Sequence, residues 1–155
     1  MQVLVTGVTG FAGGRLSGHL VESGHAVRGL VRPASRGKLA DLERTVEAVD
    51  GDLDDPASLA RACAGVEVAY HVAATYWQAG QPEAAYRAVN VEGTRHLLDA
   101  ARAAGVRRVV HCSTGGVHGH IEHPPANEDA PIAPGDIYQQ TKLEGERLAR
   151  ACGEA

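Results

Sequence analysis

The sequence predicts an α/β fold in which helices cover both faces of a doubly wound parallel sheet. Two observations predict it. Short, β-branched apolar runs alternate with longer Ala- and Leu-rich segments of helical periodicity along the 155 residues. Glycines and other turn residues stand at the joins, for example at Gly24, Gly65 and Gly105. Since strands that alternate with helices form a parallel sheet covered on both sides, we expect one domain over residues 1–155.

Each element is predicted from its own pattern. Strands are expected at residues 2–6, 26–31, 45–50, 66–73 and 107–113. Helices are expected at residues 11–23, 36–43, 56–64 and 82–104, with a last helix from 134–137 to about 151. Asp55 fits a helix N-cap, and Pro56 and Pro82 fit first-turn positions. The irregular stretch 115–135 is long for a compact domain, which is typical of a functional or mobile loop.

Composition excludes several classes of function. The apolar share is 44%, the charged share 22% and the formal net charge −4, so neither nucleic acid nor an anionic membrane is expected as a partner. No run approaches the roughly 18 apolar residues of a membrane span. Cys63, Cys112 and Cys152 are odd in number and unclustered. This argues against a disulfide framework and favours a reducing cytoplasm.

The stretch TGVTGFAGG follows the first predicted strand and opens the first predicted helix. Its glycines Gly7, Gly10 and Gly13 have the spacing GxxGxxG. Glycines at this place let the backbone turn tightly and approach a pyrophosphate at the positive end of the helix. The alternative is a tight turn without a ligand. The placement between strand and helix favours a dinucleotide and therefore a fold of the Rossmann type.

The end of the second predicted strand bears on the choice of dinucleotide. In an NAD-binding domain an acidic residue here holds the ribose hydroxyls, but Val31 occupies the position. Arg32 follows it, with Arg36 and Lys38 nearby. Because arginine binds a ribose phosphate with a bidentate fork, NADP is expected, with NAD as the alternative. Asp52, after the third strand, is placed to accept a hydrogen bond from an adenine amino group.

Tyr138 and Lys142 are four residues apart in YQQTK, which places them on one face of the last predicted helix. A neighbouring cation favours the phenolate, so Tyr138 is a candidate general base. The alternative is an unrelated pair on the surface. The histidines of HGHIEH, His118, His120 and His123, lack a convincing fourth ligand, and no metal is expected.

Six motifs occur together and in order: TGxTGFxG, GDL after the third strand, HVAA at 71–74, NVEGT at 90–94, STGGVHG at 113–119 and YQQTKLEGE at 138–146. This set resembles the extended short-chain dehydrogenase/reductases, the NAD(P)-dependent epimerase/dehydratase group, from Val3 to about Arg150. Arg32 and HVAA are most similar to its dihydroflavonol-reductase-like and hopanoid-associated sugar-epimerase branches.

The resemblance implies roles for individual residues. The catalytic set is Thr114, Tyr138 and Lys142, with Ser113 as the alternative to Thr114. Asn90 matches an asparagine that braces the active-site helix, and His118 departs from the tyrosine usual in this family. The implied cofactor-binding residues are Gly7, Thr9, Gly10, Phe11, Ala12, Gly13, Arg32, Arg36, Asp52, Leu53, Ala73, Ala74, Asn90, Ser113, Tyr138 and Lys142.

These residues favour an epimerase, dehydratase or reductase that acts on a nucleotide-sugar or a related hydroxyl or keto substrate by hydride transfer. Tyr138 is expected to have its pKa lowered by Lys142 and by the oxidised nicotinamide. The alternative function is an NAD(P)-binding regulatory or structural module without turnover. The resemblance also implies a C-terminal substrate lobe, which this chain lacks, and a homodimer through the helices at 82–104 and 134–151. Leu97, Leu98 and Leu148 equally suit packing on the sheet.

Overall fold

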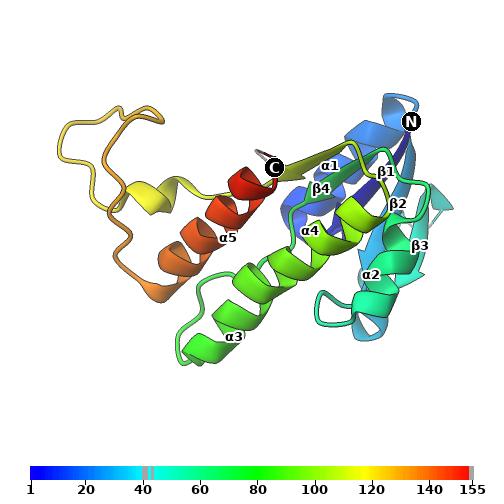
Figure 1. The fold of residues 1–155 in the computed structure, drawn as a ribbon, viewed down its shortest axis with the longest axis horizontal. Helices are drawn as coiled ribbons and strands as arrows, with labels where there is room; N and C mark the ends of the chain where they lie inside the picture. Colours follow the sequence, from blue (N-terminus) through cyan, green and yellow to red (C-terminus); the bar gives the residue numbers. More distant parts are fainter. Residues whose placement is uncertain (40–41, 43, 154–155) are drawn as a thin grey trace.

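A five-stranded parallel sheet forms the centre of the protein (Figure 1). The structure is a computed structural model, and it describes residues 1–39, 42 and 44–153. The strands are β1 (Gln2–Thr6), β2 (Ala26–Val31), β3 (Val46–Asp50), β4 (Val68–His71) and β5 (Arg108–His111). Their order is β3-β2-β1-β4-β5, and every neighbouring pair is parallel. The predicted doubly wound sheet is confirmed.

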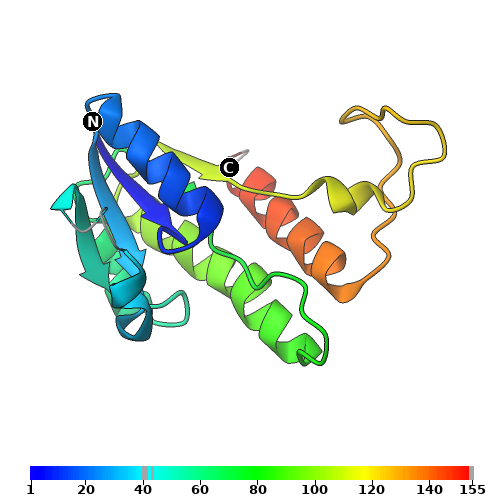
Figure 2. The same ribbon diagram turned by 180° about the vertical axis from the view of Figure 1, so that it is seen from behind.

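Helices cover both faces of this sheet. They are α1 (Phe11–Glu22), α2 (Pro56–Cys63), α3 (Glu83–Arg87), α4 (Gly93–Ala103) and α5 (Ile137–Gly153), with 3-10 helices η1 (Pro33–Lys38) and η4 (Gly115–His118) and the π-helix η3 (Ala88–Glu92). Helices α2, α4 and α5 lie on the side seen in Figure 1, and α1 lies on the opposite side, seen in Figure 2.

Strand alternation sends successive side chains into two separate core layers. Val3 and Val5 of β1 pack in the layer beneath α1, together with Leu20. Leu4, between them in sequence, packs in the other layer with Leu97 of α4. All three β1 residues are fully buried. Each such side chain stabilises the fold by about 1.5–3 kcal/mol relative to exposure.

Strand β3 begins one residue later than predicted, and two further strands are shorter than predicted at both ends. The run 66–73 pairs with β1 only over Val68–His71, because the chain then leaves the sheet. There the backbone N–H of Ala73 donates to the Thr6 hydroxyl rather than to a strand carbonyl, at 3.2 Å. The run 107–113 is a strand only over Arg108–His111, since it can pair only as far as β4 extends.

Two predicted helices differ from the structure. The helix expected at 36–43 is instead η1, which begins at Pro33, and residues 40, 41 and 43 of that prediction lie outside the described residues. Pro33 fits a first turn, and Gly37 disfavours continuation into a regular α-helix. The helix expected at 82–104 contains a π segment, Ala88–Glu92, between α3 and α4. The predicted cap is confirmed, because the Asp55 carboxylate accepts from Ala57 N at 3.0 Å.

The segment between η4 and α5 projects away from the sheet, as both ribbon views show (Figures 1 and 2). It is held at its base by the hydrogen bond from Ala133 N to Val117 O, at 3.0 Å. His118 Nδ1 lies 3.0 Å from the Ala130 carbonyl and so bonds within the loop. No cluster of three or more His, Cys, Asp or Glu side chains that could hold a metal ion occurs among the described residues.

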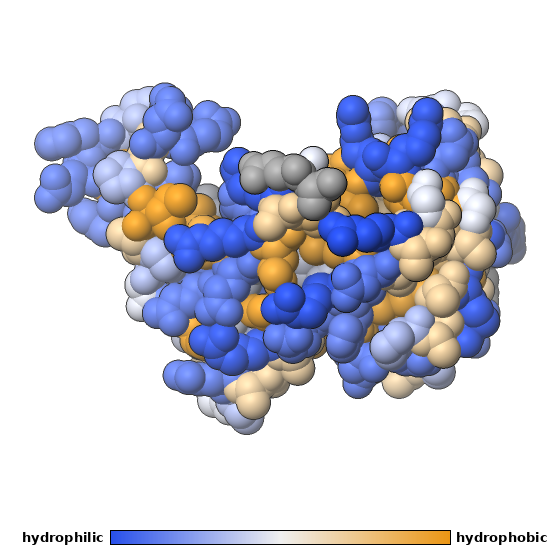
Figure 3. All heavy atoms as spheres, in the orientation of Figure 1, coloured by the Kyte–Doolittle hydropathy of each residue, from blue (hydrophilic) through white to orange (hydrophobic). Residues whose placement is uncertain are grey.

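The face formed by α4 and α5 is mainly hydrophilic, with apolar side chains visible between the charged ones (Figure 3). Leu97 and Leu98 are buried, so most of the apolar surface of α4 packs inward. A shallow groove between the two helices is lined by Leu98 and Leu148. Within the described ranges 1–39, 42 and 44–153, no helix has both the length and the apolar character needed to cross a bilayer.

Candidate functional site

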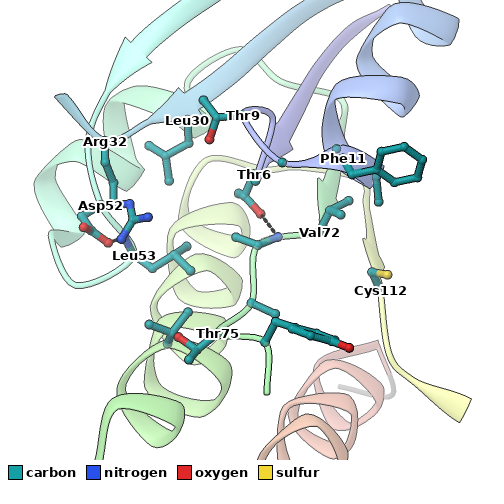
Figure 4. A pocket seen from close by; sticks show the side chains of 18 of the residues that line it. Thr6, Thr9, Phe11, Leu30, Arg32, Asp52, Leu53, Val72, Thr75 and Cys112 are labelled. Atoms are coloured by element: carbon teal, nitrogen blue, oxygen red, sulfur yellow. Dashed lines mark hydrogen bonds between the residues drawn. The ribbon is translucent and has the colours of Figure 1, made fainter. Parts of the chain in front are cut away.

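A cavity of about 560 Å³ opens at the carboxyl ends of the strands (Figure 4). It lies where β1 is flanked by β2 on one side and β4 on the other, so the chain winds in opposite directions from this point. Ligands of doubly wound sheets bind at such a switch point. The predicted residues that line it are Gly7, Thr9, Gly10, Phe11, Ala12, Gly13, Arg32, Asp52, Leu53, Ala73, Ala74, Ser113, Tyr138 and Lys142.

The glycine-rich turn forms one wall of this cavity, and close contacts explain its glycines. Gly7 has φ of 74°, and a Cβ there would lie 2.8 Å from Ala73 N. A Cβ on Gly13 would fall on the carbonyl oxygen of Gly7. The turn is closed by Gly10 N donating to Gly7 O at 2.9 Å, and no side chain caps the start of α1. Free N–H groups at a helix start suit a pyrophosphate.

Arg32 and Asp52 lie together at one end of the cavity, and Cys112 lies at the other (Figure 4). The Asp52 carboxylate accepts from Leu53 N at 2.7 Å. Arg36 does not line the cavity, contrary to the prediction. Its guanidinium instead forms a salt bridge with Asp50, at 2.9 Å, because η1 turns it toward the end of β3.

Tyr138 is half-buried in the first turn of α5, where it reaches the cavity. Its ring packs edge-on against Tyr76, with ring centres 5.5 Å apart. Burial raises the pKa of the Tyr138 phenol, and a hydrogen bond with the Thr114 side chain acts in the opposite direction. The prediction that Lys142 lowers the Tyr138 pKa is wrong. Burial of the phenol has the largest influence on its pKa and raises it. The Lys142 ammonium donates instead to the backbone carbonyl of Cys112.

Lys142 is 4% exposed and lies one turn beyond Tyr138 on the same helix. Its ammonium donates to the backbone carbonyl of Cys112, at 2.5 Å. Burial lowers the pKa of this ammonium. The side chain is therefore a buried cation anchored to the end of β5, beside the cavity.

The two adjacent hydroxyls after β5 have different partners. The Ser113 hydroxyl donates to the Glu146 carboxylate at 2.6 Å, and this bond is the main reason that the Glu146 pKa is lowered. Thr114 Oγ1 accepts from Gly116 N at 3.2 Å, and its side chain acts to lower the pKa of Tyr138. Ser113 lines the cavity and Thr114 does not, yet Thr114 is the one whose side chain affects the pKa of the candidate base.

Asn90 does not line the cavity but lies beneath it, 2% exposed in the π segment. Its side-chain oxygen accepts from Thr75 N at 2.8 Å. Its amide donates to Thr75 O and to Thr141 Oγ1, both at 3.1 Å. Asn90 thus joins the segment after β4 to helix α5.

Sequence reasoning missed several lining residues. They are Thr6, Leu30, Gly51, Val72, Thr75, Tyr76, Val89 and Cys112. Most of them stand at or just beyond predicted strand ends, which in a parallel sheet meet at one edge, so this signal was available. Trp77, in the same stretch, is 53% exposed and does not line the cavity. Its neighbour Tyr76 is the one that contacts Tyr138.

The parallel sheet and the glycine-lined cavity at its switch point define a fold of the Rossmann type. Comparison with known families narrows this class. Residues 3–155 match the model of the NAD dependent epimerase/dehydratase family, and the chain belongs to that family.

Individual relatives have different activities. Sterol demethylase protein B of Methylococcus capsulatus is 41% identical over 150 residues, which are 94% of this chain and 45% of that protein. UDP-glucose 4-epimerase of Mycolicibacterium smegmatis is 38% identical over 156 residues, 94% of this chain and 49% of that protein. A short-chain dehydrogenase/reductase superfamily protein of Agrobacterium tumefaciens, solved with bound NAD, is 41% identical with a TM-score of 0.84. That match covers 97% of this chain and 44% of the solved one. The chain thus spans less than half the length of these relatives.

Proposed function

We propose that this chain carries the cofactor site and the catalytic residues of an NAD(P)-dependent epimerase, dehydratase or reductase. The observation that supports this most is the convergence of Tyr138, Thr114 and Lys142 beside a cavity walled by Gly7 and Gly13. Bound NAD(P) supplies the hydride chemistry. Tyr138 takes the proton from the substrate hydroxyl, or returns it to the substrate carbonyl.

The neighbours of Tyr138 support this role. The Thr114 side chain acts to lower the phenol pKa, against the effect of burial. Lys142 places a buried positive charge one turn further along α5, beside the cavity, where it can hold a ribose hydroxyl. The Ser113 hydroxyl donates to Glu146, which favours Thr114 over Ser113 as the residue that positions the phenol.

The test is Tyr138→Phe in the full-length protein. We expect turnover to fall by at least about 100-fold, since general acid–base catalysis contributes that much, while the dissociation constant of the dinucleotide stays nearly unchanged. Tyr70→Phe is the matched control, because Tyr70 belongs to β4 and does not line the cavity. Unchanged kcat in Tyr138→Phe would rule out the base.

We further propose NADP as the preferred dinucleotide, although the Agrobacterium relative binds NAD. Arg32 lines the cavity, whereas the acid expected for NAD is replaced by Val31. Arg32→Ala is expected to weaken NADP binding about tenfold or more, as loss of a charged hydrogen bond implies, and to change NAD binding little. Arg36→Ala is the control, because Arg36 is paired with Asp50. Tighter binding of NAD than of NADP by the unsubstituted protein contradicts the proposal.

A nucleotide-sugar is the proposed substrate, in line with the UDP-glucose 4-epimerase relative. A panel of nucleotide-sugars, followed by cofactor absorbance and by product stereochemistry together, tests this proposal.

The second candidate function is a module that binds NAD(P) without turnover. Dinucleotide binding with no product from any substrate would favour this second candidate. A homodimer through α4 and α5 and a cytoplasmic location are also proposed. The three free cysteines, Cys63, Cys112 and Cys152, support the location.

A further inference from the structure

A buried histidine lies directly beneath the cavity. His71, at the end of β4, is 2% exposed. Its Nδ1 is 2.8 Å from the Thr6 hydroxyl oxygen of β1, and its Nε2 is 2.9 Å from the Thr94 hydroxyl oxygen of α4. The His71 ring therefore bridges strand β1, which leads into the glycine turn, and helix α4.

The partners of the two hydroxyls determine which ring nitrogen carries the proton. Thr94 donates its single hydroxyl proton to the Asn90 carbonyl, at 2.8 Å, so it can only accept from His71 Nε2. Thr6 accepts from Ala73 N at 3.2 Å, which leaves its own proton free to be donated to Nδ1 (Figure 4). The bonds form a directed chain, from Ala73 N–H through Thr6 to Nδ1 and from Nε2–H through Thr94 to Asn90.

The ring surroundings favour the neutral form. His71 is buried, the His111 ring lies with its centre 5.3 Å away, and the Lys142 ammonium is nearby. Burial first, and then these two groups, lower the His71 pKa to about 3. A neutral imidazole that donates from Nε2 must accept at Nδ1, as the geometry requires.

The chain of bonds continues to the catalytic helix. The backbone carbonyl of Asn90 accepts the hydroxyl proton of Thr94. The side-chain amide of the same residue donates to Thr141 Oγ1 at 3.1 Å. The Thr141 hydroxyl in turn lies 3.0 Å from the Tyr138 carbonyl and 2.8 Å from that of Ile137. At the other end, Ala73 touches the turn at Gly7. The buried bonds thus run from the wall of the cofactor cavity to the first turn of α5.

We propose that His71 is a positioning residue of this site: its neutral imidazole, protonated on Nε2, sets the placement of the Tyr138-bearing turn of α5 relative to the glycine turn. The proposal rests on the proposed function only for the catalytic role of Tyr138. The residue does not touch the cavity, so it acts through Thr94 and Asn90.

The first experiment determines the tautomer in the unsubstituted protein. Long-range ¹H–¹⁵N spectra between pH 5.5 and 8 are expected to show one neutral form of His71, protonated on Nε2, throughout. His120 and His123, exposed in the loop, serve as internal references. A proton on Nδ1, or a mixture of tautomers, overturns the proposal.

The second experiment breaks the chain at Thr94. Thr94→Val removes the hydroxyl at nearly constant volume, and Thr94→Ser keeps it. If the bonds position the first turn of α5, Thr94→Val moves the phenol relative to the Thr114 side chain, and that side chain lowers the phenol pKa in the unsubstituted protein. That pKa, followed by the ring ¹³C resonance, is expected to rise by roughly 0.5 to 1 pH unit in Thr94→Val and to stay unchanged in Thr94→Ser.

Equal phenol pKa values in the two variants, each with wild-type melting behaviour, overturn the positioning role. Thr94→Ala replaces Thr94→Val if the valine variant does not fold. Neither measurement requires turnover. A protein with no detectable activity but with the expected tautomer and pKa difference therefore refutes the proposed function and leaves this inference standing.

Discussion

Neighbouring residues of similar chemistry have different roles here because their partners come from distant parts of the chain. Ser113 and Thr114 both carry a hydroxyl, but the first donates to Glu146, whereas the second accepts from Gly116 N and influences the pKa of Tyr138. In the same way Arg32 reaches the cavity, whereas Arg36 pairs with Asp50. At the residue scale, the role of a side chain follows from its partner rather than from its type.

Gly13 gives a prediction at this scale. A Cβ on Gly13 would fall on the backbone carbonyl of Gly7, which cannot move without opening the turn. Gly13→Ala is therefore expected to destabilise the protein by about 1–3 kcal/mol and to abolish dinucleotide binding. Urea unfolding and NAD(P) titration measure the two effects.

Gly18→Ala is the matched control, because Gly18 lies in the same helix and a Cβ there would meet no atom of the described residues within 4 Å. It is expected to stabilise the protein by about 0.5–1 kcal/mol, since alanine restricts the unfolded chain. Equal stability and equal dinucleotide binding in Gly13→Ala and Gly18→Ala would show that the turn does not require the close contact between Gly13 and the Gly7 carbonyl.

At the scale of elements, the π segment is the feature that organises the site. The segment Ala88–Glu92 interrupts what would otherwise be one helix, and it carries Asn90 beneath the cavity. π segments inside helices often occur at functional sites. Helix α5 can approach this segment because residue 145 is glycine, where a Cβ would lie 2.5 Å from the Asn90 carbonyl oxygen.

Gly145→Ala is accordingly expected to push α5 away from the π segment. The predicted cost is about 1–3 kcal/mol of unfolding free energy, as for an overpacked core position. Gly153→Ala, at the last residue of α5, where a Cβ would meet none of the described atoms within 4 Å, is expected to change stability by less than about 0.5 kcal/mol. Urea unfolding of both variants checks this, and a Gly145→Ala protein as stable as the control would contradict the close packing.

At the scale of the whole molecule, two histidines on one face of the sheet link stability to pH. Burial lowers the pKa of His71 to about 3 and that of His111 to about 4. In the unfolded chain both titrate near 6.5. The native state therefore binds fewer protons than the unfolded state between about pH 6.5 and 3. Stability is complete above this window and is lost as the pH falls through it.

The predicted slope from the fully buried His71 is at most about 1.4 kcal/mol per pH unit. His111→Phe is expected to flatten the pH dependence, and both ring nitrogens of His111 lack a hydrogen-bond partner among the described residues. His123→Gln, in the exposed loop, is the control and should leave the slope unchanged. Urea unfolding between pH 7.5 and 4.5 measures how the free energy of unfolding changes with pH in each variant. Identical slopes in His111→Phe and the unsubstituted protein would contradict this linkage.

The fold and most of the cavity could be predicted from the sequence, because they depend on local signals. Alternating periodicities encode strands and helices, Asp55 caps its own helix, and Gly7, Gly10 and Gly13 mark the turn that lines the cavity. Tyr138 and Lys142 are neighbours through helical spacing alone. Such features need only residues that are close in the chain.

The tertiary structure decided the rest, because the deciding contacts join residues far apart in sequence. Ser113 and Glu146 are 33 residues apart, Asn90 and Thr141 are 51 apart, and Thr6 and His71 are 65 apart. No periodicity specifies such pairs. They form only when packing brings strand ends and helices to one edge of the sheet, and there they determine which hydroxyl meets Tyr138 and which nitrogen of His71 carries a proton.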